Sequence, residues 1–166
     1  MAAAAALPEN WVWRDGPVAP GPVAVFDLDG VLSDAAGRQH FLMGTGRKDW
    51  KSFFDHVGSD PLVEDVNRLL ELLDEGLAIV LLSARPARVR AETIAWLERY
   101  DIRWDLLVMR PDGAQESAVD FKRSVVQLLQ QVGFDLRIAF EDDRRNVEMF
   151  RAAGVACVYI HSGYYE

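Results

Sequence analysis

The sequence is poor in several features, and each scarcity excludes a class of protein. Its 166 residues contain one cysteine, Cys157, so no disulfide can form within the chain and no disulfide-linked partner is expected. No stretch approaches the roughly 18 consecutive apolar residues of a membrane-spanning helix, which predicts no membrane partner. The opening MAAAAALPEN lacks the basic residues of a signal peptide, so we expect a frayed, alanine-rich tail on a cytoplasmic protein.

Positive charge is also scarce. Lys and Arg number 18 against 26 Asp and Glu, which gives a formal net charge of −8 at pH 7. Such a field repels polyanions at long range and argues against a broad surface that coats nucleic acid or membrane, although a local basic pocket stays compatible with it. Half of the residues are hydrophobic and 27% are charged, which is typical of one globular domain with a sizeable core.

The chain is predicted to consist of an irregular N-terminal arm, residues 1–22, and one α/β domain, residues 23–166. Short apolar runs alternate with helical patterns throughout the domain. The predicted strands are 23–26, 78–82, 106–109, 138–140 and 155–160, and the predicted helices are 65–75, 87–99, 121–132 and 146–153. Gly76, Gly133 and Gly154 are expected to end three of these helices. This alternation predicts a doubly wound, parallel, five-stranded sheet with helices on both faces.

Residues 33–61, between the first strand and the first long helix, are too few for a large lid domain. We expect only a small helical cap there, with Trp50, Phe53 and Phe54 packing it down. A weakly capped crevice admits a bulky substrate.

Polar residues follow three of the predicted strands. The first strand runs into Asp27-Leu28-Asp29-Gly30, the second into Ser83-Ala84-Arg85, and the fourth into Glu141-Asp142-Asp143. Lys122 precedes the last group, near the start of its helix. Each feature has an ordinary structural interpretation: a turn at Asp29 and Ser83, a helix cap at Asp143, a solvated lysine. Because ligands bind at the carboxyl ends of parallel strands, their joint occurrence favours a site.

The residue types at these strand ends fit the hydrolysis of phosphate monoesters. Carboxylates that converge on one crevice repel each other unless a cation is bound, and oxygen ligands suit Mg²⁺. A hydroxyl, an arginine and a lysine can hold a phosphoryl group. One carboxylate can accept that group as a nucleophile, and a second can move protons to the leaving oxygen and from water.

In this order the residues resemble the haloacid dehalogenase (HAD) superfamily, whose pattern is D-x-D-G-[TV], then Ser/Thr, then Lys, then an acidic strand end. The resemblance covers roughly residues 23 to 163 and implies a HAD-like, Rossmann-type fold. It implies that Asp27 is the nucleophile, that Asp29 is the general acid and base, and that Ser83 and Lys122 bind phosphate. Lys122 would also restrain Asp27.

The same resemblance implies a Mg²⁺ cofactor. The ion would be held by Asp27, the backbone carbonyl of Asp29 and Asp142, with Asp143 as a further ligand or as support behind the ligands.

A closer likeness is to the 3′-phosphatase domain of phage-type polynucleotide kinase-phosphatases. Those domains share Gly-Arg, Ser-x-Arg and Asp-Asp-Arg elements, which are matched here by Gly37-Arg38, Ser83-Ala84-Arg85 and Asp142-Asp143-Arg144. By this likeness Arg38 and Arg85 bind the substrate phosphate, a task that suits a bidentate guanidinium. The sequence contains no G-x-x-x-x-G-K-[ST], so no kinase half is expected in it.

The resulting hypothesis is a Mg²⁺-dependent phosphomonoesterase that acts through an aspartyl-phosphate, with a polynucleotide 3′ end as substrate. One alternative keeps the mechanism and replaces the substrate with a mononucleotide or another small phosphate ester. A second alternative is a non-catalytic phosphate-binding module. A signalling receiver domain fits poorly, because the third strand ends in Met109-Arg110 instead of an aspartate.

A basic patch around the mouth of the crevice is a further expectation. Its candidate residues are Arg38, Arg47, Lys48, Lys51, Arg85 and Arg110. A solvated loop is the alternative for the segment 47–51. Tyr164 and Tyr165 are candidates for stacking on a base, with ordinary packing as the alternative.

Overall fold

The computed structural model of the protein describes residues 7–165. Of the predicted frayed tail, residues 1–10, the first six lie outside the described residues, whereas Leu7 packs partly buried against the core. Among residues 7–165, no helix is long and apolar enough to cross a membrane. Cys157 is a free, buried thiol, as a lone core cysteine should be.

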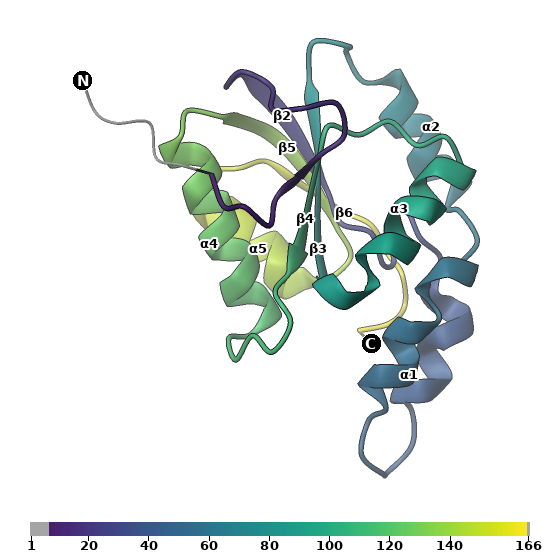
Figure 1. The fold of residues 1–166 in the computed structure, drawn as a ribbon. Coiled ribbons are helices and arrows are strands. Elements are labelled where there is room, and N and C mark those ends of the chain that lie inside the picture. Colours follow the sequence, from purple (N-terminus) through teal and green to yellow (C-terminus); the bar gives the residue numbers. More distant parts are fainter. Residues whose placement is uncertain (1–6, 166) are drawn as a thin grey trace.

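A six-stranded sheet forms the centre of the molecule (Figure 1). Its strands are β1 (Val12–Trp13), β2 (Pro22–Phe26), β3 (Ala78–Pro86), β4 (Leu106–Arg110), β5 (Asp135–Glu141) and β6 (Cys157–Tyr159). They lie in the order β1-β4-β3-β2-β5-β6, and all neighbours from β4 to β6 are parallel. The predicted parallel sheet is confirmed, but the predicted number of five strands is wrong, because β1 from the N-terminal arm adds an antiparallel edge strand to β4.

Helices cover both faces of this sheet (Figure 1). One face carries α2 (Glu64–Leu72) and α3 (Arg90–Arg99), and the other carries α4 (Ala118–Gln131) and α5 (Arg144–Ala152). Alternate residues of β2 serve the two cores: Val23 and Val25 pack under α4 and α5, whereas Ala24 and Phe26 pack under α2 and α3. A strand that is apolar on both faces is what a central parallel strand requires.

The end of α2 differs from its prediction. The helix stops before the end of the predicted range 65–75, and Gly76 does not terminate it. Instead, the guanidinium of Arg103 donates to the carbonyl oxygens of Leu73 and Leu77. A side chain that is distant in sequence therefore satisfies the carbonyl group of the C-cap residue Leu73 and one in the turn that follows it.

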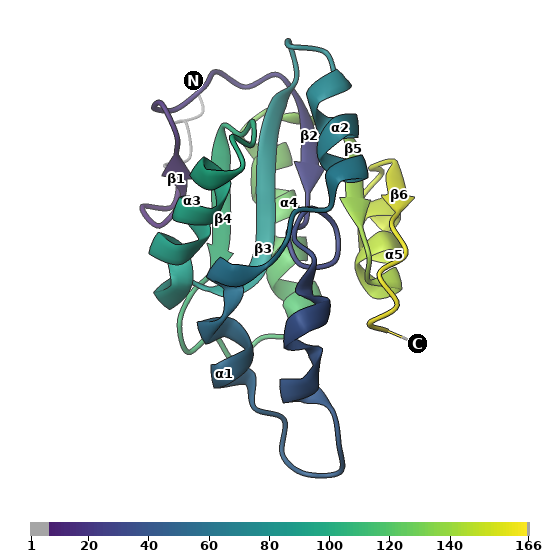
Figure 2. The ribbon, with the colours of Figure 1, turned by 90° about the vertical axis from the view of Figure 1, so that its right-hand side faces the viewer.

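Residues 33–61 form three short helices beyond the carboxyl ends of the strands, hereafter the cap (Figure 2). They are the 3₁₀ helix η1 (Ala35–Leu42), α1 (Trp50–Asp55) and the 3₁₀ helix η2 (Val57–Ser59). Phe53 packs the cap down as predicted, with 5% of its surface exposed. The same prediction is wrong for Trp50, which remains 49% exposed.

Candidate active site

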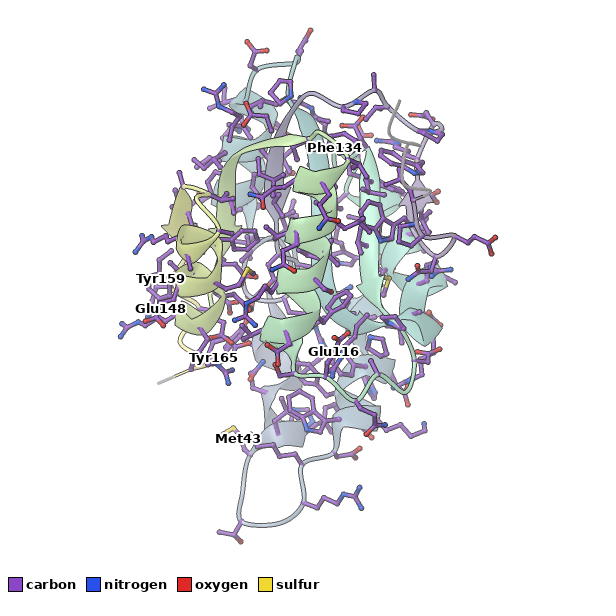
Figure 3. All side chains as sticks on the ribbon, turned by 90° about the vertical axis from the view of Figure 1, so that its left-hand side faces the viewer. Met43, Glu116, Phe134, Glu148, Tyr159 and Tyr165 are labelled. Carbon is purple, nitrogen blue, oxygen red and sulfur yellow. The ribbon has the colours of Figure 1, made fainter. Side chains whose placement is uncertain are left out.

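The carboxyl ends of β2 and β5 bring Asp27 and the acidic residues after Phe140 together. Asp27 directly follows β2, and its amide donates to the carbonyl oxygen of Phe140 at 3.1 Å. This end of the molecule carries Met43, Glu116 and Tyr165 in Figure 3, whereas Phe134 marks the opposite end. Met43 and Tyr165 line the same cleft as Asp27.

Gly30 allows the loops after β2 and β5 to approach each other. Its φ of +81° lies in the region that favours glycine. A Cβ at this position would lie only 2.1 Å from Oδ2 of Asp142. Any other residue at position 30 would therefore displace Asp142, which explains why the motif needs glycine here.

Three buried carboxylates meet at the base of the cleft. Asp27, Glu141 and Asp142 offer oxygen atoms that lie within 4.8 Å of one another. Burial, followed by the charge of Asp27, raises the pKa of both Glu141 and Asp142 well above the usual carboxyl range, although the nearby Ser162 hydroxyl opposes the shift of Asp142. Oε2 of Glu141 and both oxygens of Asp142 receive no hydrogen bond of normal geometry from the described residues.

Lys122 contacts two of these acids from the first turns of α4. Its buried Nζ lies 3.1 Å from Oδ1 of Asp27 and 2.5 Å from Oε1 of Glu141. Burial alone would lower the pKa of Lys122, but the charges of Asp27 and Glu141 outweigh burial and raise it. Lys122 is therefore a fixed positive charge that orients Asp27.

This donor set fits a hard divalent cation. When all three carboxyl groups are ionised, as cation binding requires, they leave two negative charges that Lys122 does not compensate in a buried place. Mg²⁺ takes oxygen ligands and is commonly bound by one or two carboxylates together with waters and phosphate oxygens. Asp27 and Asp142 provide such carboxylates, and the free Oε2 of Glu141 is a further donor.

Two buried arginines hold Asp29. Nη2 of Arg38 and Nη2 of Arg85 each lie 2.7 Å from Oδ1 of Asp29, and neither contact uses Oδ2. Burial alone would raise the pKa of Asp29, but the charges and hydrogen bonds of Arg85 and Arg38 outweigh burial and lower it. Arg85 lines the cleft, whereas Arg38 lines a neighbouring hollow and reaches Asp29 through its Nη2.

Asp60 in the cap completes this network, and sequence reasoning missed it. Its carboxylate accepts hydrogen bonds from Nε and Nη2 of Arg38, both at 2.7 Å, and from Oγ of Ser33 at 2.5 Å. Its backbone oxygen accepts a hydrogen bond from the indole of Trp96 in α3. Asp60 thus anchors the cap and balances the charge of the arginines.

The hydroxyl of Ser83 lies below the floor of the cleft. Ser83 is 1% exposed, and its Oγ accepts a hydrogen bond from the amide of Arg85 at 3.1 Å. The serine therefore shapes the irregular end of β3 that turns Arg85 toward Asp29. A phosphate that entered the cleft would meet Arg85 and Lys122 before Ser83.

Asp143 caps a helix, which is one of the two roles that the sequence allowed for it. Its Oδ1 accepts a hydrogen bond from the amide of Arg145 at 3.0 Å, and its Oδ2 lies 2.7 Å from the guanidinium of the same arginine. Asp143 does not belong to the cluster of three acids. Glu141 does, although the predicted ligand set omitted it; its position at an acidic strand end was the available signal.

These groups open into a cleft of about 710 Å³. Asp27, Asp29, Arg85 and Lys122 form its polar floor. Around them it is lined by aromatic and cationic side chains: Trp50, Phe53, Phe54, Tyr164 and Tyr165, with Lys48, Arg110 and Arg145. Of the predicted basic patch, Arg47 and Lys51 do not line this cleft but an adjoining hollow of the cap, which shares Lys48 and Trp50 with it.

Comparison with known families gives a match over most of the chain. Residues 22–165 match the model of the family described as the polynucleotide kinase PNKP phosphatase domain. Among curated proteins, none matches significantly.

Solved structures share the fold. A chain of the Pnkp1/Rnl/Hen1 RNA repair complex has a TM-score of 0.69 and 23% identity, over 90% of this chain and 45% of that one. A second structure of the Pnkp1/Rnl/Hen1 complex gives a TM-score of 0.71 and 24% identity, over 94% and 52%. This chain therefore spans about half the length of those relatives. A haloacid dehalogenase-like hydrolase from Streptococcus pneumoniae aligns over 89% of this chain and 91% of its own, with a TM-score of 0.59 and 15% identity.

Proposed function

The chain belongs to the family of polynucleotide kinase PNKP phosphatase domains, and we propose that it removes the terminal phosphate from polynucleotide 3′ ends. It is a phosphatase of the haloacid dehalogenase type. The proposed reaction passes through an acyl phosphate of Asp27 (an aspartyl-phosphate) and uses Mg²⁺. The observation that carries the chemistry is the contact of Asp27 with Lys122 beside two further buried acids.

Asp27 is the nucleophile of this proposal. The amide of Leu28 donates to its Oδ1 at 2.8 Å, and Nζ of Lys122 lies 3.1 Å from the same oxygen. These two contacts fix the carboxylate and leave Oδ2 to attack the phosphorus. The attack forms the bond between Asp27 and phosphorus while the bond from phosphorus to the 3′ oxygen breaks.

Asp29 moves the protons. When protonated on Oδ2, it gives its proton to the leaving 3′ oxygen, and it then takes one from the water that hydrolyses the aspartyl-phosphate at Asp27. Arg38 and Arg85 hold the pKa of Asp29 low in the free protein. A bound phosphate acts in the opposite direction, because its like charge raises that pKa and because it competes for Arg85.

Asp27 and Asp142 are the side chains that would hold Mg²⁺, with Glu141 and the backbone carbonyl of Asp29 beside them. When bound, the cation offsets the negative charge on the phosphate oxygens. Asp143 is the weaker candidate of the acidic loop, because its carboxylate is already paired with Arg145.

The family match carries the choice of substrate, and the cleft supports it. The cap beside the cleft consists of short helices, so a chain end can enter, and Lys48, Arg110 and Arg145 provide local positive charge. The structural relatives come from an RNA repair complex, which makes an RNA end the first substrate to test. The net charge of −8 favours the rival substrate, a mononucleotide or another small ester.

The test measures phosphate release from RNA and DNA oligonucleotides that carry a 3′-phosphate, with Mg²⁺ and with EDTA. Matched 5′-phosphorylated oligonucleotides and 3′-mononucleotides are the controls, and Asp27→Asn is the inactive reference. Metal-dependent release that favours the 3′ end supports the proposal. Equal or faster release from mononucleotides would replace the polynucleotide with a small ester and leave the mechanism in place.

A further inference from the structure

The cap presents an exposed aromatic surface to the cleft. Trp50 stands on α1 with its ring stacked on Phe54, at 5.9 Å between centroids and 22° between planes. Phe53 meets the same ring edge-on at 5.6 Å and is itself held by the guanidinium of Arg38, 4.3 Å from its centroid. Trp50 is therefore fixed from behind while 49% of it stays exposed.

Packing of the cap does not account for this exposure. Phe53 is buried and fills the contact between cap and core, and Phe54 covers one side of Trp50. The largest apolar side chain of the cap is thus the one left half in solvent. A rigid, exposed indole beside a binding site is typical of residues that bind ligands by stacking.

The charges around Trp50 point to a nucleotide as its ligand. Nζ of Lys48 lies 5.8 Å from the centroid of the indole, and Arg110 lines the same cleft. Nε of Arg110 is buried and has no hydrogen-bond partner among the described residues. Cations beside an aromatic face form the combination that binds single-stranded nucleic acid, where bases stack and the backbone is neutralised.

The same cleft holds the predicted phosphate-transfer residues. Asp27, Arg85 and Lys122 form its floor and Trp50 forms part of its cap-side wall. On the C-terminal side, Tyr165 is exposed over the guanidinium of Arg145, 5.9 Å from its ring centroid (Figure 3). When a terminal 3′-phosphate lies at the floor, the base of the same nucleotide lies in the wider part of the cleft.

We propose that Trp50 is a base-stacking subsite for the 3′-terminal nucleotide, with Lys48 and Arg110 as contacts for the adjoining backbone phosphate. The proposal rests on the proposed polynucleotide substrate and adds the side chain that recognises its last base. Because every base has a π-face, stacking of this kind tolerates any sequence. The subsite therefore selects a nucleotide end over a simple phosphate ester without reading its base.

The experiment compares two 3′-phosphorylated oligonucleotides that differ only in the last nucleotide, which carries a base in one and is abasic in the other. The wild type is compared with Trp50→Leu, which keeps an apolar contact with Phe54 but has no ring, and with Trp50→Phe, which keeps a ring. Leu72→Ala, at an exposed leucine of α2 away from the cleft, is the surface control.

The readout is the ratio of kcat/KM between the base-bearing and the abasic substrate. Loss of one stacked base corresponds to a change of about 10-fold, so we expect a ratio of roughly 10 in the wild type and in Leu72→Ala, falling toward 1 in Trp50→Leu. Trp50→Phe should keep an intermediate ratio. The ratio cancels any general loss of folded enzyme.

An unchanged ratio in Trp50→Leu, or a wild-type ratio of 1, overturns the subsite while the proposed 3′-phosphatase function stands. Absence of release by the wild type from both oligonucleotides, with release from a mononucleotide, overturns the proposed function and this subsite with it.

Discussion

The two halves of the site treat buried charge in opposite ways. On the cap side, Asp29 and Asp60 face Arg38 and Arg85, so two negative charges meet two positive ones. On the β5 side, Asp27, Glu141 and Asp142 carry three negative charges when all are ionised, and Lys122 is the cation that pairs with them among residues 7–165. The first half is electrically complete within the protein. The second lacks two positive charges, which is the charge of one divalent cation.

This difference suggests that one half of the site has a structural role and that the other half binds the proposed metal ion. A balanced buried network fixes geometry, because each member is hydrogen-bonded and loss of one member strands the others. An unbalanced cluster is costly until a cation enters, so its members are retained for what they bind. We therefore interpret the arginine side as the frame that positions Asp29 and the β5 side as the metal centre.

The largest effect is expected where the two halves meet, at Asp27. Asp27→Asn keeps the shape and the hydrogen bond from Leu28 but removes the carboxylate that we propose as the nucleophile. We expect turnover to fall at least about 1,000-fold, with the fold retained. Phosphate release measures the turnover, and circular dichroism of the variant measures whether the fold is retained. Turnover at the wild-type rate would show that Asp27 is not the nucleophile.

The next largest effect is expected when the balanced half is broken. Asp60→Asn leaves the charge of Arg38 buried without its main partner, which typically costs about 3–5 kcal/mol of unfolding free energy. Urea unfolding measures this loss. Replacing both partners, in Arg38→Met with Asp60→Leu, should recover much of the stability but not the turnover, because Asp29 has lost one of its two arginines.

If Asp60→Asn unfolds at the same urea concentration as the wild type, the claim that Asp60 balances the buried charge of Arg38 is contradicted. Full turnover in the double variant would show that Arg38 does not position Asp29.

In the unbalanced half, replacing an aspartate with asparagine should raise the unfolding free energy of the metal-free protein instead of lowering it. Burial raises the pKa of Asp142 to about 8, so its charge costs stability mainly above that pH; there the metal-free Asp142→Asn variant should be more stable than the wild type. Mg²⁺ should stabilise the wild type, by about 2.7 kcal/mol at 100 times the dissociation constant, and should leave Asp142→Asn unchanged. Calorimetric melting above the pKa of Asp142, in EDTA and in excess Mg²⁺, tests this; a lower melting temperature of Asp142→Asn in EDTA would argue against the imbalance.

The smallest effect on stability is expected at the rim of the cleft, at Arg145. The side chain of Arg145 is 70% exposed where it pairs with Asp143. Solvent screens this guanidinium, and the backbone amide of residue 145 still donates to the carboxylate of Asp143, whose side chain is only 7% exposed; Arg145→Ala should therefore change the unfolding free energy by no more than about 1 kcal/mol. The same urea assay compares this variant with Asp60→Asn. A similar loss of unfolding free energy in both variants would contradict the expected difference between the buried network and the pair at the rim.

The sequence predicts the half of the site that depends on local pattern. The D-x-D-G turn after an apolar strand, the acidic end of β5 and a lysine early in α4 could all be located from order and periodicity, because parallel strands end at one edge. Glu141 was within reach of the same reasoning.

The other half depends on contacts between distant segments. Arg38 was expected at the mouth of the cleft, and nothing in the sequence pairs it with Asp60 in the same cap. β1 is only two residues long between turn-forming segments, so its pairing with β4 depends on tertiary contact. The early end of α2 depends on Arg103, and the exposure of Trp50 depends on Phe53 having filled the cap interface first.

The most direct test of the account is calorimetric titration of Mg²⁺ into the wild type, Asp142→Asn and Asp143→Asn. The two variants remove neighbouring carboxylates, one from the unbalanced cluster and one from a pair with Arg145. We predict one ion per chain in the wild type and in Asp143→Asn, and no measurable binding in Asp142→Asn. Binding that survives in Asp142→Asn but is lost in Asp143→Asn would contradict the charge imbalance as the origin of the metal site.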